Sequence, residues 1–157
     1  MSIVAKVIAQ SDRAERFLSS AELTQLQDFF SNGSVRISAA QKLSANQDKI
    51  VQEGSKRFWA QCPNTPSNSG DPKKTALCQR DQGWYIRLVS YCVLAGNSKP
   101  LEDIGLDGMR DMYVSLRVPL ANLKLAMRCL KEVAMGQLSS EEAAIAGPYF
   151  DQLIRAF

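Results

Sequence analysis

The chain has 157 residues and a mass of 17.4 kDa, the size of one ordinary domain. Its apolar fraction of 45% is enough for a hydrophobic core and excludes a disordered chain, and its net charge of +3 is far below the dense positive charge of a nucleic-acid-binding protein. It contains no histidine, which disfavours haem globins, most hydrolases with a catalytic triad and Cys₂His₂ zinc fingers.

The N-terminal part of the sequence predicts two helical segments. Apolar residues spaced three or four apart predict a short amphipathic helix over residues 3–12. Ser19 and Glu22 match a capping box, which predicts a second helical pattern that continues to Leu43 with an interruption near Gly33. Because a helix as short as residues 3–12 is marginally stable alone, we expect it to lie on its own domain or on another subunit.

The rest of the sequence predicts further helices and one loop. Ser44 and Gln47 match a second capping box, which predicts a helix from there towards Cys62. Residues 63–72, rich in Pro, Asn and Ser, predict a surface loop. Further helices are predicted over residues 74–95 with Gly96 after the last turn, over 102–116, over 120–135, and from the Ser139 capping box to the end with a kink at Pro148. The prediction is one all-α, globin-like domain, residues 1–157, of about eight helices.

The four cysteines are expected to be free thiols. Cys62, Cys78, Cys92 and Cys129 include no CxxC pair, so no metal site is predicted. The N-terminal residues do not match a signal peptide, and we therefore expect a reducing compartment. No apolar run approaches the roughly 18 residues of a membrane-spanning helix.

The segment CQRDQGWYIR, residues 78–87, carries the most distinctive chemistry. On a helix, Cys78, Asp81 and Tyr85 share one face, so that a thiol, a carboxylate and a phenol lie together. Arg80 and Trp84, four residues apart, lie on the adjoining face.

A glycine at position 83 is expected to leave a gap where a flat group could approach the backbone. Together, a thiol, a carboxylate, a guanidinium and two aromatic side chains around this gap predict a site for a large planar ligand with acidic substituents. A long core helix with a buried cysteine and two aromatic residues is the alternative interpretation.

This segment resembles the pigment-attachment helix of the phycobiliprotein family. The family pattern Cys-x-Arg-Asp-x-x-aromatic-Tyr-x-Arg appears here as CQRDQGWYIR, followed by LVSYCVLAG. The segments MSIVAKVIAQSD, IGLDGMRDMYVSL and LSSEEAAIAGPYFDQLI are also similar to the α-type chains of its allophycocyanin group, so the resemblance covers essentially the whole chain. It implies a globin-like phycobiliprotein fold with two extra N-terminal helices, about residues 1–30, that clasp a β-type partner chain.

The resemblance also implies residue roles. Cys78 would be the thioether attachment site of one phycocyanobilin, an open-chain tetrapyrrole, and Asp81 would hydrogen-bond its inner pyrrole N–H groups. Arg80 would pair with a propionate of the pigment. The other pocket residues implied are Lys74, Trp84, Tyr85, Met112 and Tyr113, and the implied α–β interface positions are Asp12, Arg87 and Tyr91.

Two departures from the family pattern suggest a far-red-absorbing, allophycocyanin B-like member. Trp84 stands where common α-type chains carry tyrosine, and its larger indole is expected to hold the terminal ring of the pigment more coplanar. The family's GGNAYG loop is replaced by the shorter run SNSGDP, residues 67–72, so the contacts of that loop cannot be transferred.

The implied function is light harvesting without enzymatic activity. The chain would absorb red or far-red light and pass the energy towards photosystem chlorophyll, as a peripheral protein at the cytoplasmic face of the cyanobacterial thylakoid membrane. Its partners would be an allophycocyanin β-type chain, in an αβ heterodimer and in rings or stacked or helical assemblies, and a phycobilisome core linker or a photosystem. The alternative is a pigment-free, globin-like interaction or sensor protein.

Overall fold

The computed structural model describes residues 2–157, and every regular element in this range is a helix. In chain order the elements are α1 (Ile3–Arg13), α2 (Ser20–Ser31), α3 (Gly33–Ala45), α4 (Gln47–Gln61), the 3₁₀ turn η1 (Pro66–Asn68), α5 (Pro72–Ala95), the π-helical turn η2 (Leu101–Leu106), α6 (Met109–Ser115), α7 (Leu120–Met135) and α8 (Ser140–Ala156). The predicted all-α class is confirmed.

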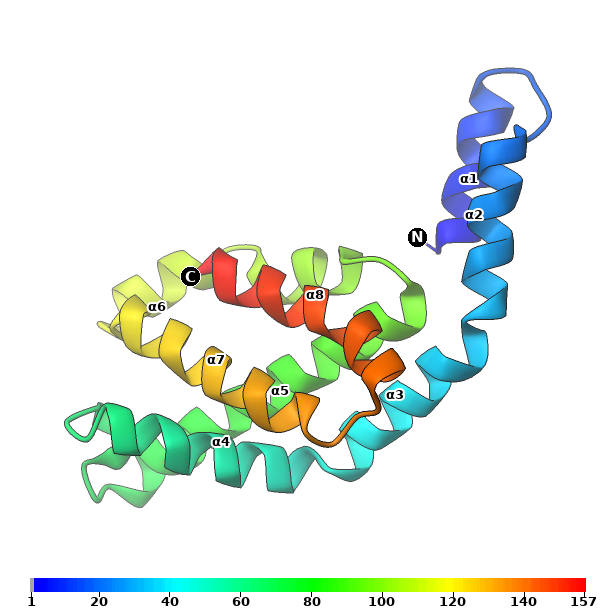
Figure 1. The fold of residues 1–157 in the computed structure, drawn as a ribbon. Coiled ribbons are helices and arrows are strands. Elements are labelled where there is room, and N and C mark those ends of the chain that lie inside the picture. Colours follow the sequence, from blue (N-terminus) through cyan, green and yellow to red (C-terminus); the bar gives the residue numbers. More distant parts are fainter. Residues whose placement is uncertain (1) are drawn as a thin grey trace.

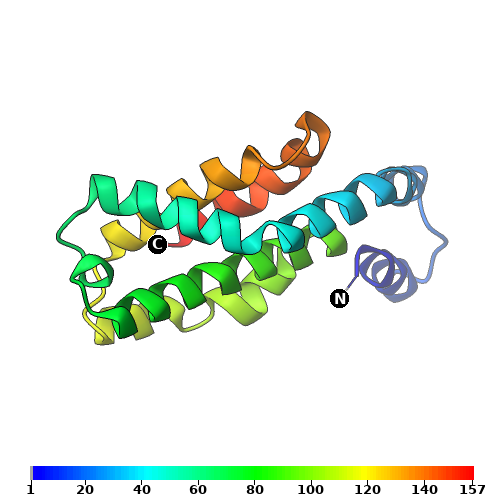
Figure 2. The same ribbon diagram turned by 90° about the horizontal axis from the view of Figure 1, so that it is seen from below.

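Helices α3 to α8 form a body around one hydrophobic core (Figures 1 and 2). The most extensive packing joins α4 to α7 and α3 to α5, and α8 lies against α7, α3 and α5. Helix α5 runs through the middle of this body and contributes the fully buried Tyr85, Leu88 and Val89. The same helix carries the CQRDQGWYIR segment, so one face of that segment belongs to the core.

Helices α1 and α2 form a hairpin that projects away from the body (Figure 1). Helix α2 buries no residue, and α1 buries only Val7 and Ser11. The hairpin is closed by a salt bridge of 2.7 Å between Arg16 and Glu22, beside the fully formed Ser19 capping box. The single residue Asn32 separates α2 from α3, as the predicted interruption near Gly33 requires.

The capping boxes were not all predicted correctly. Those at Ser19 and Ser139 form with both reciprocal hydrogen bonds. The one predicted at Ser44 is wrong, because α3 continues through Ala45 and Asn46 precedes α4 without a side-chain cap. At this position the helical pattern of α3 outweighs the local preference of a serine for a cap.

Two further segments differ from their predictions. The helix predicted over 102–116 is two elements, η2 and α6, separated at Gly108, whose φ of +66° is left-handed and ends regular helix. The predicted surface loop 63–72 contains η1, and it buries Thr65 and Ser67. By contrast, helix α8 continues through Pro148 without interruption.

The C-terminal end of α5 is a tight junction. Gly96 has φ +64° and ends α5, as predicted. A Cβ placed on it would lie 2.7 Å from a ring carbon of Phe29 on α2, so the base of the hairpin is packed closely against the body. No helix within residues 2–157 combines the length and apolarity that crossing a bilayer requires.

Candidate pigment-binding site

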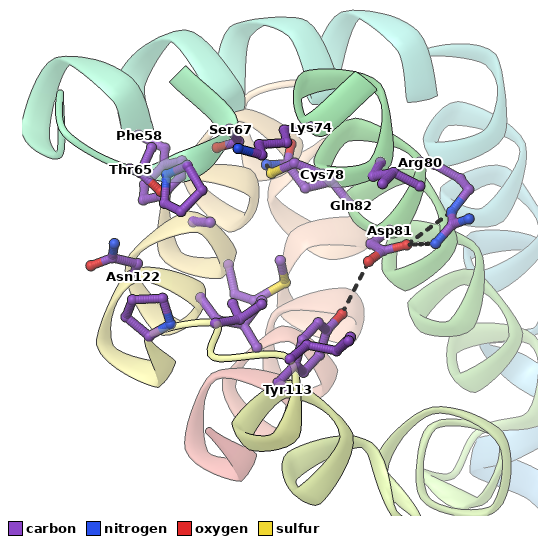
Figure 3. A pocket seen from close by; sticks show the side chains of 18 of the residues that line it. Phe58, Thr65, Ser67, Lys74, Cys78, Arg80, Asp81, Gln82, Tyr113 and Asn122 are labelled. Atoms are coloured by element: carbon purple, nitrogen blue, oxygen red, sulfur yellow. Dashed lines mark hydrogen bonds and ion pairs between the residues drawn. The ribbon is translucent and has the colours of Figure 1, made fainter. Parts of the chain in front are cut away.

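A pocket of about 380 Å³ opens between the N-terminal half of α5, the loop around η1 and the segment joining α6 to α7. Its volume is within the usual range of ligand sites. Most of its wall is apolar and comes from Phe58, Pro66, Leu77, Leu116, Val118, Pro119, Leu123, Ala126 and Met127. Figure 3 shows the polar side chains that interrupt this wall.

Cys78 and Asp81 line the pocket from successive turns of α5 (Figure 3). Asp81 accepts a hydrogen bond of 2.8 Å from Arg80 and one of 3.4 Å from the hydroxyl of Tyr113. Burial raises the pKa of Tyr113 to about 12, so its hydroxyl remains a donor at neutral pH. The structure therefore brings five of the predicted residues into one site: Lys74, Cys78, Arg80, Asp81 and Tyr113.

The thiol of Cys78 lies in a polar corner of the pocket. Its sulfur accepts a hydrogen bond of 3.3 Å from Nε2 of Gln82, whose Oε1 accepts one of 2.8 Å from the hydroxyl of Ser55. Burial raises the pKa of the Cys78 thiol, whereas hydrogen bonds from Ser67 and Gln82 lower it and the charge of Asp81 raises it further. Burial is the largest of these effects, so the thiol is protonated at neutral pH.

Three cationic side chains stand around the pocket. Lys74 lies 3.8 Å from Asp71 at the start of α5, Arg80 pairs with Asp81, and Arg117 lines the opposite wall. Arg117 has φ +55°, a conformation that non-glycine residues seldom adopt. The arrangement provides guanidinium and ammonium groups for acidic substituents of a ligand.

The loop before α5 forms a fixed wall of the pocket. The hydroxyl of Ser67 accepts a hydrogen bond of 3.1 Å from the indole N–H of Trp59 on α4. The backbone carbonyl of Ser67 accepts one of 2.8 Å from Thr75 on α5. Because Ser67 and Thr65 are both buried, this short loop belongs to the site.

Three predicted pocket residues lie outside the wall that residues 2–157 form. Met112 is exposed on α6, Trp84 is half-buried, and Tyr85 is fully buried in the core. The ring centroids of Trp84 and Tyr85 are 5.1 Å apart, and Tyr85 also packs on Phe157 at 5.9 Å. The Tyr85 hydroxyl has no hydrogen-bond partner within the described residues, and burial raises its pKa.

The gap predicted at Gly83 does not face the pocket. A Cβ at Gly83 would lie 3.4 Å from Nε2 of Gln47, so the missing side chain lets α5 approach the start of α4. This prediction is wrong because residue 83 lies on the core side of α5, where the helices pack closely.

The predicted interface residues and the other cysteines lie away from the pocket. Asp12 on α1 and Arg87 and Tyr91 on α5 are exposed. Cys62, Cys92 and Cys129 form no disulfide, and burial raises the pKa of Cys92 to about 11. No group of three potential metal ligands occurs within residues 2–157.

Several site residues were missed from the sequence. Thr65 and Ser67 are in a segment that reads as a surface loop, and Gln82 shows no local pattern that separates it from an exposed glutamine. Its place four residues after Cys78, on the same helical face, is the one available signal. For Arg117, no signal in the sequence marks the left-handed turn.

Residues 6–157 match the family model described as "Phycobilisome protein". The chain is 44% identical to the allophycocyanin alpha-B chain of a Synechococcus strain, an alignment that covers 99% of this chain and 97% of the relative. It is 43% identical to the allophycocyanin subunit alpha-B of a Nostoc strain and 42% identical to the allophycocyanin alpha chain of Cyanophora paradoxa, with 99% of both chains covered in each case.

Proposed function

Because the chain belongs to the phycobilisome protein family, we propose that it carries one phycocyanobilin, joined to Cys78 by a thioether, and passes absorbed energy towards photosystem chlorophyll. As a member of that family it is a light-harvesting, bilin-binding subunit of the allophycocyanin type and not an enzyme.

The observation that supports this assignment is the juxtaposition of Cys78 and Asp81 on one apolar pocket. The sulfur supplies the atom for a covalent bond, and the carboxylate is one helical turn away on the same wall. A carboxylate beside the protonated nitrogens of a bilin would favour their charged form. The residues present therefore fit a conjugated group with N–H donors in its middle and acidic side chains.

The remaining pocket residues have roles that follow from their places. Arg80 and Lys74 would pair with propionates, and Tyr113 would hold the Asp81 carboxylate in position through its hydrogen bond of 3.4 Å. The bound pigment supplies the conjugated system that absorbs visible light. The apolar walls hold that system stiff, which limits the loss of excitation as heat through rotation of its bridges.

The red or far-red colour is part of the proposal. It is supported by Trp84, which shares its turn of α5 with Tyr85, and by the short loop fixed through Ser67. Because Trp84 lies outside the pocket wall of this chain, its influence on a pigment would be exerted through Tyr85, which packs with Tyr113 around the ring of Phe157.

The partners are proposed from the N-terminal hairpin. Its exposed apolar residues would pair with a β-type chain, together with Asp12, Arg87 and Tyr91, in an αβ heterodimer that builds rings or stacked or helical assemblies. Such assemblies would contact a core linker or a photosystem at the cytoplasmic face of the thylakoid membrane.

Substitution of the thiol tests the attachment site. The chain and its variants are produced with phycocyanobilin and a β-type chain, and pigment that stays bound on a denaturing gel is detected by zinc-enhanced fluorescence. We expect Cys78→Ala to lose the covalent pigment and Cys62→Ala, which removes a half-buried thiol outside the pocket wall, to keep it. A colourless native complex would contradict the proposed function and favour a pigment-free interaction protein.

A further inference from the structure

Gln82 is a fully buried polar residue on the pocket wall, and only 1% of its surface is exposed. A buried amide without partners would be costly, and this one makes hydrogen bonds at both ends. Its two partners, Ser55 and Cys78, lie on α4 and α5. The residue therefore connects the core of the body directly to the proposed attachment atom.

The two hydrogen bonds have a fixed direction. The hydroxyl of Ser55 donates to Oε1 of Gln82, which leaves the NH₂ group of the amide facing the sulfur of Cys78. An amide NH₂ group can only donate, so the sulfur must accept. A hydrogen bond of this kind is stronger when the acceptor is ionised, and it therefore stabilises the thiolate more than the thiol.

Ser67 approaches the same sulfur from the loop. Its hydroxyl oxygen already accepts from the indole of Trp59, at 3.1 Å, so its own proton is available for another acceptor. Hydrogen bonds from Ser67 and Gln82 both lower the pKa of the Cys78 thiol, against the opposing effect of burial. Ser67 and Gln82 thus line the pocket together with Cys78, and Gln82 donates to the sulfur at 3.3 Å.

We propose that Gln82, oriented by Ser55, is a positioning residue that holds the Cys78 sulfur towards the pocket and favours its thiolate when the thioether forms. This inference rests on the proposed function. Thioether formation adds S–H across an exocyclic carbon–carbon double bond: the S–C bond forms, the π bond breaks, and the thiol proton ends on the neighbouring carbon, so no oxidant or reductant is required. The thiolate is the reactive form of cysteine in such an addition.

The test measures the reactivity of Cys78 against pH in the full chain without pigment. Iodoacetamide is the probe, and mass spectrometry of the peptide that carries Cys78 follows its alkylation separately from the other cysteines. Gln82→Met keeps the size of the side chain but removes the donor. We expect it to move the pH profile of Cys78 to higher pH and to slow alkylation at pH 8 about tenfold, the effect of roughly one pKa unit.

Two further variants make the result specific. Gln79→Met changes a glutamine of the same helix that does not line the pocket, and should leave the profile within about twofold of the unmodified chain. Ser55→Ala keeps the donor but releases its orientation, and should give a smaller shift in the same direction, about threefold. If Gln82→Met does not fold, Ser55→Ala alone tests the role of Gln82.

Attachment of phycocyanobilin to the same proteins separates the two proposals. If the unmodified chain attaches no pigment, the proposed function is wrong, whatever the alkylation profile. If the unmodified chain attaches pigment but Gln82→Met and Ser55→Ala match its profile and attachment rate, the role of Gln82 is wrong and the proposed function stands. The proposal is upheld if the variants slow both reactions and Gln79→Met slows neither.

Discussion

The two oxygens of the Asp81 side chain face different partners. Oδ1 accepts from the guanidinium of Arg80, and Oδ2 accepts from the hydroxyl of Tyr113. The first contact is solvent-exposed and contributes little to stability, because exposed ion pairs are weak. Arg80 can therefore turn to another anion at little energetic cost, while Tyr113 keeps the carboxylate aimed at the pocket.

Asp81→Asn is expected to change the colour of the assembled protein. An amide cannot favour the protonated form of a bilin, so the main absorption band should weaken and move to shorter wavelength. The measurement is the absorption spectrum of the purified αβ complex. Asp103→Asn, which removes an ion-paired carboxylate on η2 outside the pocket, is the matched control and should leave the band in place. An unmoved band in Asp81→Asn would contradict the role of this carboxylate.

At the scale of single residues, the sequence predicted those parts of the site that a family pattern names, including Tyr113 on another helix. Cys78, Arg80 and Asp81 were found because helical spacing and a family pattern both point to them. Gln82 and Ser67 were missed because their roles depend on Ser55 and Trp59, which are distant along the chain. A tertiary hydrogen bond of this kind has no local signature.

Among the elements, the junction of α5 with the hairpin gives a quantitative prediction. Gly96 and Gly108 have nearly the same φ, +64° and +66°, but a Cβ would meet the Phe29 ring only at Gly96. Gly108→Ala should cost about 1 kcal/mol for the left-handed backbone alone. Gly96→Ala should cost about 1 kcal/mol more because of the added contact, as measured by urea unfolding. Equal losses of unfolding free energy in the two variants would show that the Phe29 ring moves aside without cost.

Helices α3 and α8 are connected through the buried carboxylate of Glu142. It accepts hydrogen bonds from Lys42 at 2.7 Å and from Ser38 at 2.6 Å, and its Oε2 also accepts the backbone N–H of Ser139. These contacts, above all the one from Lys42, lower the pKa of Glu142 from 4.5 to about 2.

Glu142→Gln should therefore destabilise the chain in a pH-dependent way. The loss should be about 2 kcal/mol at pH 7, where the native carboxylate is charged and fully paired. Because the pKa is lower in the folded state, this stabilisation is present above pH 4.5 and is lost as the pH falls towards 2. The unfolding free energies of the unmodified chain and of Glu142→Gln, measured with urea at each pH, should converge as the pH falls from 4.5 to 2. Glu141→Gln, at an exposed neighbour, should unfold like the unmodified chain at every pH.

Element boundaries were predicted well where a cap or a glycine decides them locally. Ser19, Ser139 and Gly96 act through their own side chains or backbone angles, so the sequence is sufficient. The Ser44 box failed because packing decided it: helix α3 continues while its buried face remains in contact with the core. The single helix predicted over 102–116 failed for a local reason, because Gly108 is left-handed and separates η2 from α6.

At the scale of the whole molecule, the hairpin presents apolar surface that the chain does not cover. Phe17 at its tip is 96% exposed, and Leu23 and Phe30, seven residues apart on one face of α2, are 55% and 63% exposed. An exposed apolar patch of this kind marks a protein interface. The short helix α1 packs on α2 within the hairpin, and the exposed apolar surface of the hairpin is where we expect a partner chain to bind.

Leu23→Glu is expected to weaken pairing with a β-type chain at least tenfold, because a charge would be buried in an apolar interface. Sedimentation of the two purified chains measures the association. Ala21→Glu adds the same charge about 160° around α2 and should leave association unchanged. Equal binding by both variants would place the interface elsewhere. Thermal unfolding of each variant alone should match the unmodified chain within about 0.5 kcal/mol.

The double attachment of Ser67 has a consequence for how such a protein can diversify. Its hydroxyl is held from α4 by Trp59 and its carbonyl from α5 by Thr75, so the wall of the pocket moves only when one of these core helices moves. Substitutions that adjust the spacing of α4 and α5 will reshape the pocket without touching anything inside it. Substitutions in the packing between α4 and α5, outside the pocket, can thus change the colour of the bound pigment during evolution.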